Sequence, residues 1–343
     1  MLTSVLLVLV IVAFIAIGLI AWALLLGLGL RWAKAREWTW RRAAATTVVV
    51  NVASTAYMLL ALRLIDQPTE HKLAAATLFL VGYFVFTVGI VSWSFRLSVL
   101  RAFQAWLPTL LSGLAGVALS FLLVRPLLFE PYVIPTNSMA PTLLGWHGRD
   151  TCATCGGTCY FTPPPGHVRH VPPLPMICDQ FHVTHKQPSS SETFIPTRIA
   201  VAKFLRPKRW DLIVFDLPSN PQDVYVKRVV GLPGETVVIE NGRVLINGKE
   251  VEMPEELEGL EYLTEMLTDG PYPRPIRAGS AEHPAQLADD EYFVLGDFSI
   301  NAYDARLWEQ GAEGHPPYAV PHSHVRGVVS HIVWPPERLR VLR

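Results

Sequence analysis

The sequence is poor in charged residues and lacks several common catalytic signatures. Only 17% of its 343 residues are charged and the formal net charge is zero, so no basic field indicates nucleic-acid binding. Neither Gly-x-Ser-x-Gly nor His-Glu-x-x-His occurs, which argues against a hydrolase nucleophile elbow and a zincin metalloprotease. Gly242 and Gly248-Lys249 have the wrong spacing for a phosphate loop. No internal repeat is visible.

What the sequence does have is long apolar runs, all in its first part. A bilayer core needs about 20 apolar residues as helix. The first run has no basic segment before it and exceeds the roughly 7–15 apolar residues of a signal peptide, so we expect a retained helix. The second is the weakest, because Asn51 and Arg63 interrupt it. Residues 1–128 therefore form the predicted transmembrane region, with about four helices, at 2–30, 43–65, 73–94 and 107–128.

Basic residues in the loops between these runs predict an orientation. The first loop is strongly basic, the second is nearly balanced, and the third contains Arg96 and Arg101. Because positive loops stay in the cytoplasm, the N-terminus and everything after residue 128 are expected outside. The first loop holds Arg31, Lys34, Arg36, Arg41 and Arg42; the second holds Asp66, Glu70, His71 and Lys72.

Residues 129–343 consist of short β-type runs without a βαβ rhythm, which predicts a mostly antiparallel β domain. Asn241-Gly242 between two apolar runs indicates a hairpin. A Cys/Pro-rich insertion at 145–197 and a smaller appended segment at about 241–290 interrupt the pattern, the second with a short helix expected near 255–267. The predicted strands are 211–217, 224–230, 237–239, 244–246, 292–295 and 327–334.

Lys227 stands in the middle of one such run. Side chains alternate along a strand, so Tyr225, Lys227 and Val229 share one face, and Arg228 lies on the other. Both faces are otherwise apolar, so we expect one of the two bases to be desolvated. A buried lysine loses its proton more easily and can act as a general base for a serine, whereas arginine keeps its charge. The alternative is a strand lysine that reaches the surface.

Four segments, in order, resemble those of type I bacterial signal peptidases, membrane-bound Ser–Lys endopeptidases that remove signal peptides. The resemblance covers roughly 129–144, 205–240 and 290–334, and the last segment matches only in part. The segments are Glu130–Leu143 (EPYVIPTNSMAPTL), Arg209–Phe215 (RWDLIVF), Tyr225–Gly234 (YVKRVVGLPG) and Gly296–Arg306 (GDFSINAYDAR).

The resemblance implies roles for particular residues. Ser138 is the nucleophile and Lys227 the general base, and the Ser138 N–H and the Thr136 hydroxyl form the oxyanion hole. Asp304 and Arg306 match a structural ion pair, and Arg228 is expected to be structural as well. Shallow pockets for small substrate side chains would be formed by Ile134, Pro135, Met139, Tyr225 and Val226.

The last segment departs from the family. Its lysine-orienting serine is Ala302 here, and its Asn-Arg-Asp run is Phe298-Ser299-Ile300. Ser299, Asn301 or water would have to replace the lost partner. The alternative is a catalytically impaired homologue that binds signal peptides or secretion partners without cleaving. Trp210, where the family usually has glycine, is a smaller departure. Repressor autoproteases share the chemistry but carry a DNA-binding head that this chain lacks.

The four cysteines all lie between residues 152 and 178. Cys152-x-x-Cys155-Gly is typical of a turn around zinc, which could be completed by Cys178 with Cys159, His182 or His185. Two disulfides are the alternative in an oxidising compartment, and free thiols are a third. Catalysis itself is expected to need no cofactor. The expected partners are preprotein signal peptides, membrane lipid and the secretion machinery, with no nucleic acid, at a multi-pass cytoplasmic-membrane location.

Overall fold

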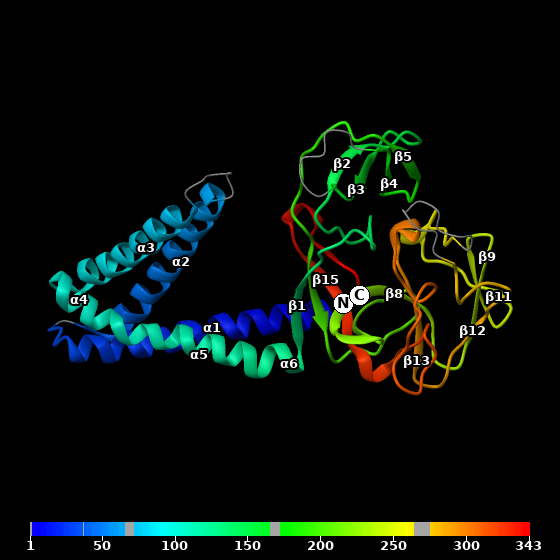
Figure 1. Ribbon diagram of the computed structural model, residues 1–343. Helices are drawn as coiled ribbons and strands as arrows, with labels where there is room; N and C mark the ends of the chain where they lie inside the picture. The colour runs from blue at the N-terminus through cyan, green and yellow to red at the C-terminus, as the bar shows by residue number, and fades with distance from the viewer. Residues whose placement is uncertain (1, 37, 66–71, 165–171, 264–274) are drawn as a thin grey trace. The chain divides into compact units, whose positions relative to one another are not determined.

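The computed structural model describes residues 2–36, 38–65, 72–164, 172–263 and 275–343. The chain divides into a helical unit, Ser4–Val124, and a β-rich unit, Arg125–Arg343 (Figure 1). The helical unit is built from α1 (Leu2–Trp32), α2 (Trp40–Ile65), α3 (Lys72–Phe95), α4 (Val99–Trp106), a 3-10 turn (Leu107–Thr109), α5 (Leu110–Leu119) and a π turn (Ser120–Val124), which continues into α6 (Arg125–Leu127).

The predicted start of the fourth helical stretch, residue 107, is wrong. The helix begins at Val99, so Arg101 lies within α4 instead of in a loop. The physical reason is that α4 is amphipathic: it buries Ala102, Ala105 and Trp106 while Arg101 stays exposed. Close packing follows at Ala105, because a Cβ at Gly29 of α1 would lie 1.9 Å from the Ala105 carbonyl oxygen.

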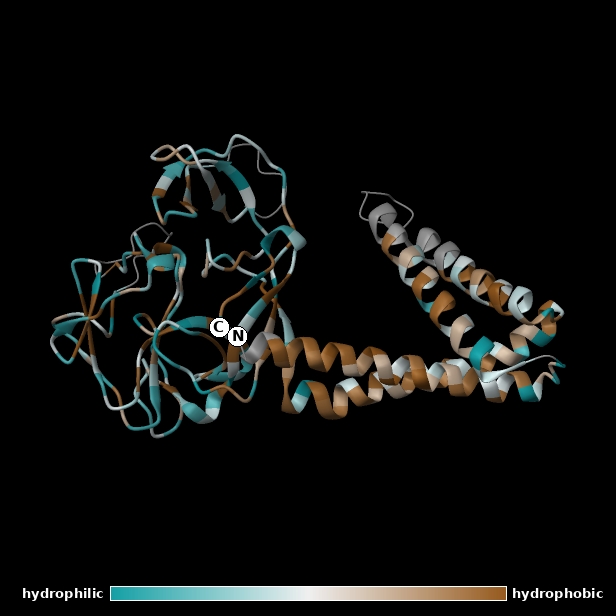
Figure 2. Ribbon diagram, turned by 180° about the vertical axis from the view of Figure 1, so that it is seen from behind, coloured by the Kyte–Doolittle hydropathy of each residue, from teal (hydrophilic) through white to brown (hydrophobic). Residues whose placement is uncertain are grey.

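Two of the helical stretches are long and apolar enough to cross a membrane. They are Val5–Trp32 and Val99–Leu127, drawn mostly brown in Figure 2, and both keep nearly all of their apolar surface exposed. The apolar part of α3, Leu80–Phe95, is shorter, and α2 does not qualify within the described residues. The predicted count of four spans is therefore not shown. Asp66, Glu70 and His71 of the second loop lie outside the described residues.

The β-rich unit is organised around one eight-stranded sheet in which all strand pairs are antiparallel, as the sequence predicts. Its order is β1-β6-β15-β7-β8-β13-β14, with β16 pairing to β15. The bounds are β1 (Phe129–Val133), β6 (Arg198–Ala202), β7 (Leu212–Leu217), β8 (Asn220–Gly231), β13 (Glu291–Leu295), β14 (Val320–Pro321), β15 (Val325–Trp334) and β16 (Arg340–Val341).

Each segment that interrupts the main sheet contributes a four-stranded sheet of its own. The first lies within 145–197 and has the order β2-β3-β4-β5; the second has the order β11-β10-β9-β12. These strands are β2 (Gly148–Thr151), β3 (Thr158–Phe161), β4 (Leu174–Cys178), β5 (Val183–Lys186), β9 (Thr236–Glu240), β10 (Arg243–Ile246), β11 (Lys249–Glu250) and β12 (Ala285–Gln286).

Local backbone geometry explains one success and one failure in the second sheet. Asn241 and Gly242 both take positive φ, 50° and 79°, and close the predicted β9–β10 hairpin. The helix expected near 255–267 is wrong within the described residues, which contain only a 3-10 turn, Glu255–Leu257. Gly259, at φ 89°, turns the chain away from a helical path. Residues 264–267 lie outside the described part.

Candidate active site

Ser138 lies in the turn that follows β1, and the side chain before it fixes the shape of that turn. Asn137 is buried; its amide donates to the Trp146 carbonyl at 2.8 Å and to Thr162 Oγ1 at 3.1 Å, and its Oδ1 accepts from the Gly145 N–H at 2.8 Å. A turn held in this way positions the partly exposed serine without using the serine hydroxyl.

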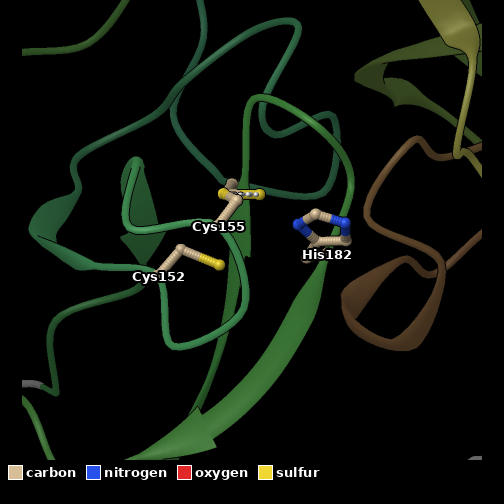
Figure 3. A group of neighbouring side chains, drawn as sticks. Cys152, Cys155 and His182 are labelled. Carbon is tan, nitrogen blue, oxygen red and sulfur yellow. Dashed lines mark hydrogen bonds between the residues drawn. The ribbon is translucent and has the colours of Figure 1, made fainter.

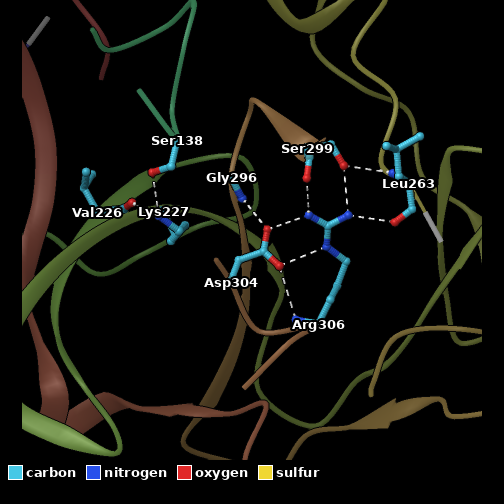
Figure 4. Close-up of polar contacts among 8 residues, drawn as sticks. All are labelled: Ser138, Val226, Lys227, Leu263, Gly296, Ser299, Asp304 and Arg306. Atoms are coloured by element: carbon cyan, nitrogen blue, oxygen red, sulfur yellow. Dashed lines mark hydrogen bonds and ion pairs between the residues drawn. The ribbon is translucent and has the colours of Figure 1, made fainter. Parts of the chain in front are cut away.

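Lys227 meets Ser138 from β8. Its Nζ lies 2.9 Å from Ser138 Oγ and 3.1 Å from the carbonyl oxygen of Val226 (Figure 4), and only 3% of the lysine is exposed. Burial lowers the pKa of the Lys227 ammonium to about 8, although the negative charges of Asp304 and Asp297 act to raise it. A substantial fraction of the amine is therefore neutral near physiological pH and able to accept a proton.

Arg228, the next residue, is buried on the opposite face and has a different task. Its Nε and Nη2 donate to the two carboxylate oxygens of Asp297 at 2.7 and 2.5 Å, and Nη1 donates to the Trp210 carbonyl at 2.7 Å. Residues 134–147, the loop between β1 and β2 that carries Ser138, are called the serine loop. Thr142 in this loop donates a hydrogen bond to Asp297 at 2.5 Å. The expectation that one of the two bases is desolvated was too narrow: both are buried, and this ion pair ties β8 to the serine loop.

Asp304 and Arg306 form the predicted ion pair, with no exposed side-chain surface. Asp304 also accepts from the Gly296 N–H at 3.0 Å, and Arg306 donates to Ser299 Oγ at 2.8 Å and to the Leu263 carbonyl at 2.7 Å (Figure 4). This network holds the last segment of the family pattern in place behind the lysine.

The hydroxyl missing at Ala302 is not replaced by Ser299. Ser299 Oγ accepts from Arg306 and from the Leu263 N–H, and Ala302 is buried. Asn301 lines the neighbouring cleft, but within the described chain Lys227 Nζ hydrogen-bonds only Ser138 and the Val226 carbonyl. The lysine is oriented by its own strand, with one hydroxyl fewer than the family pattern implies.

A cleft of about 370 Å³ opens beside the serine and the lysine. Of the predicted substrate-binding residues, Ile134, Pro135, Tyr225 and Val226 line it. Met139 does not: it is fully buried in an apolar cluster with Leu143 and other residues of the main sheet. Sequence reasoning missed several lining residues, which come from loops or the outer end of β8: Asn137, Thr162, Val224 and Tyr303.

The two expected oxyanion donors, the Ser138 N–H and the Thr136 hydroxyl, belong to residues that line the same cleft. Among the described residues neither donor has a hydrogen-bond acceptor. Both are therefore available to a group bound in the cleft.

The backbone conformation at Trp210 accounts for the glycine that the family usually has at this position. Its φ is 69°, in the left-handed region that glycine adopts most readily. Here the tryptophan is held by its N–H, which donates to the Val229 carbonyl at 2.8 Å, and by Nε1, which donates to the Glu252 carbonyl at 3.2 Å.

The cysteines of the first insertion do not act as one group of four. The ligand atoms of Cys152, Cys155, Cys178 and His182 lie within 4.8 Å of one another. Figure 3 labels three of these residues, Cys152, Cys155 and His182. The prediction that includes Cys159 among the metal candidates is wrong for this cluster. Cys159 lies within strand β3, and its sulfur packs 3.6 Å from the Met176 sulfur. No pair of the four cysteines is joined by a disulfide.

Comparison with known proteins gives the family of the chain. Residues 176–334, which include Lys227 but not Ser138, match the family model described as signal peptidase, peptidase S26. A signal peptidase I of Leptolyngbya laminosa is 34% identical over 165 residues, covering 43% of this chain and 68% of that protein. Signal peptidase I S of Bacillus subtilis is 27% identical over 195 residues, covering 54% of this chain and 70% of its own length.

A crystal structure of a signal peptidase I from Enterococcus faecalis is also similar. It is 26% identical over 36% of this chain and 97% of that one, with a TM-score of 0.26, too low for an argument about fold. The family assignment rests instead on the Leptolyngbya laminosa relative, which is 34% identical and matched over 68% of its length, and the family model names the same family. On that evidence this chain belongs to the signal peptidase I family, the serine endopeptidases of peptidase family S26.

Proposed function

We propose that this protein is a membrane-bound signal peptidase in which Ser138 attacks the substrate and Lys227 is the general base. The observation that carries the proposal is the 2.9 Å contact between Lys227 Nζ and Ser138 Oγ inside a site where the lysine is almost fully buried. Burial makes Lys227 able to act as a base, because a lysine with a pKa of about 8 can be neutral when the serine needs a proton acceptor.

The reaction begins when Ser138 Oγ attacks the scissile carbonyl and its proton moves to the Lys227 amine. The developing oxyanion receives hydrogen bonds from the Ser138 N–H and the Thr136 hydroxyl. Each such donor is worth about 10²–10³-fold in rate. The Lys227 ammonium then gives its proton to the leaving amine. Water, activated by the same lysine, hydrolyses the acyl-enzyme ester and regenerates the serine.

The substrate class follows from the cleft and from the family. Ile134, Pro135, Tyr225 and Val226 give the cleft a mostly apolar wall beside the serine. We propose that this wall accepts the small side chains that precede a signal-peptide cleavage site. The reaction uses no cofactor, and a metal held by the cysteine cluster would be structural.

The apolar helices support a location in the membrane. We propose that the helical unit spans the cytoplasmic membrane more than once, in contact with lipid, with the β-rich unit on the outer face. Arg31 in the last turn of α1, with Lys34 and Arg36 after the helix, favours a cytoplasmic position for that loop. A catalytic unit outside meets translocated preproteins, and membrane anchoring holds enzyme and cleavage site near one plane. Preproteins arriving from the secretion machinery are the proposed partners.

The test is preprotein cleavage by the full-length protein in detergent. Lys227→Ala, which removes the general base, is expected to lose about 10²–10⁴-fold in kcat/KM. Ser138→Ala, which removes the nucleophile, is expected to lose more, on the order of 10⁶-fold. Ser191→Ala and Lys249→Ala, which change the same residue types at exposed positions, serve as controls and should retain full activity. Cleavage that persists in both site variants would overturn the Ser–Lys assignment, and absence of cleavage by the wild type would support the binding-only alternative.

A further inference from the structure

The small sheet β2–β5 brings three cysteines and one histidine together from two separate turns. Cys152 and Cys155 lie in the turn between β2 and β3, and Cys178 and His182 flank the turn between β4 and β5. Their ligand atoms all lie within 4.8 Å of one another (Figure 3). Three sulfurs and an imidazole nitrogen form one of the common tetrahedral zinc ligand sets.

The spacing between the two turns fits a shared metal ion. With Zn–S bonds of about 2.3 Å, the sulfurs of a tetrahedral site lie roughly 3.8 Å apart. The sulfurs of Cys155 and Cys178 are 3.8 Å apart. A disulfide would require about 2.05 Å between the same atoms.

Backbone hydrogen bonds close both turns. In the first turn the Cys152 N–H donates to the Gly157 carbonyl at 2.7 Å, and the Gly156 N–H donates to the Cys152 carbonyl at 3.0 Å. In the second turn the Cys178 N–H donates to the His182 carbonyl at 3.1 Å, and the Phe181 N–H donates to the Cys178 carbonyl at 2.9 Å. Gly156, at φ 73°, allows the first turn to close behind Cys155.

His182 supplies an independent observation. Its Nδ1 is buried and has no hydrogen-bond partner in the described part of the chain. A buried nitrogen without a partner gives up its hydrogen bond to water and gains none in the protein, which is unfavourable. Coordination of a metal ion by this nitrogen would remove that cost.

The cysteines lie in a small apolar cluster of their own, apart from Tyr160 and Ile177 of the same sheet, which pack into the main core. This cluster contains five buried residues, three of them cysteines: Cys152, Cys159, Phe161, Met176 and Cys178. A cluster of this size contributes little stability by itself, and a metal ion that joins the two turns would add to it. The sheet matters to the cleft because Thr162, next to β3, lines it and accepts a hydrogen bond from Asn137.

We propose that Cys152, Cys155, Cys178 and His182 bind one structural Zn²⁺ that joins the two turns and supports the Thr162 side of the cleft. The proposal stands apart from the Ser–Lys assignment, because it concerns a metal content that can be measured without catalysis.

The experiment is elemental analysis of the full-length protein purified in detergent without chelator. One zinc per chain is expected in the wild type and in two control variants, Cys159→Ser and His185→Ala, which change the same residue types outside the cluster. Cys155→Ser and His182→Ala should lose most of the zinc, because each removes a ligand. Cobalt exchanged into the wild type should show thiolate charge-transfer absorption that both ligand variants lose.

Several outcomes would overturn the proposal. They are a wild type that contains no stoichiometric zinc, a disulfide linking any two of the four cysteines in mass spectra of the unreduced protein, and zinc that is lost in Cys159→Ser but retained in His182→Ala. Loss of the metal from a ligand variant is expected to loosen the sheet, so the wild-type metal content, which depends on no variant, decides the proposal by itself.

Discussion

The carbonyl oxygen of Ser138 occupies the space that a side chain at Gly296 would need. A Cβ at Gly296 would lie 2.7 Å from that oxygen and 2.4 Å from the Cβ of Ala302. The Ser138 carbonyl also accepts a hydrogen bond from the Phe298 N–H at 3.2 Å. The serine loop and the last segment of the family pattern therefore touch through backbone, with no flexible side chain to move aside.

Gly296→Ala is therefore expected to push the serine away from the lysine. A displacement of about 1 Å can cost about 10²-fold in rate, so kcat/KM should fall by roughly that factor. Preprotein cleavage measures the loss. Gly113→Ala, at a position where a Cβ meets nothing within 4 Å, is the control. Full activity in Gly296→Ala would show that the loop accommodates the methyl group.

The activity should depend on pH through Lys227. Burial lowers the pKa of this ammonium to about 8, and only the neutral amine can accept the serine proton. The value of kcat/KM should therefore rise as pH increases and level off above about 8. Initial rates at substrate concentrations below KM, in buffers of constant ionic strength, give this profile. A rate that is flat or that falls through this range would contradict a lysine base.

The same burial should cost stability near neutral pH. Unfolded lysine keeps its proton up to its ordinary pKa of 10.5, whereas folded Lys227 loses it at about 8. Between these values the unfolded state binds more protons, so the wild type gains stability as pH rises, by about 3 kcal/mol in all.

Lys227→Met should remove this dependence and unfold at a higher temperature than the wild type at neutral pH. Thermal unfolding in detergent at a series of pH values compares the two proteins. Lys249→Met, at an exposed position, should match the wild type. A wild-type stability that declines between pH about 8 and about 10 while Lys227→Met is unaffected would contradict the burial argument.

Ala302→Ser tests the missing orienting group. The lysine now has Ser138 and the Val226 carbonyl as its partners, and Ala302 is buried in the neighbouring segment. A hydroxyl there that hydrogen-bonds the lysine would contribute about 1 kcal/mol, or roughly fivefold in kcat/KM. Ala305→Ser, at a buried position three residues further along, controls for adding a hydroxyl elsewhere. An activity that falls in Ala302→Ser would mean that the site is already complete.

Breaking the buried ion pair should unfold the β-rich unit more easily. Asp297→Ala leaves the Arg228 guanidinium buried without its carboxylate, a change that typically costs about 3–5 kcal/mol. Glu309→Ala breaks the exposed pair with Arg277 and should cost about 0–1 kcal/mol. Chemical unfolding of both variants measures the difference. Equal effects would mean that the buried pair contributes no more than a surface pair.

Patterns of short range predicted much of the main sheet. The alternation in β8 placed Lys227 and Arg228 on opposite faces, and Asn241-Gly242 predicted its hairpin. Asp297 as the partner of Arg228 was not predicted, because the two residues are 69 positions apart and nothing local links them. Ser138 and Lys227 are 89 positions apart, and the local sequence around either residue does not predict a contact with the other. Only the family resemblance predicts this pair.

The sequence does not predict the strands of the sheet β2–β5, which lie in the Cys/Pro-rich insertion at 145–197. Its strands are four or five residues long, and their burial does not alternate cleanly, so no period of two is visible. Cys159 was grouped with the other cysteines because sequence spacing does not reveal which residues fall in turns and which in mid-strand. The cleft residues Thr162 and Tyr303 come from irregular segments, where periodicity carries no information.

Two cations stand next to each other in β8, one able to release its proton near neutral pH and one unable to. Pairing with β7 sets Lys227 opposite Ile213 and Arg228 opposite Leu212. A slip of one residue would turn every side chain of β8 to the other face and present the serine with a guanidinium that stays charged. A single-residue deletion between Asn220 and Lys227 would therefore exchange the base for an inert cation even if the sheet still formed.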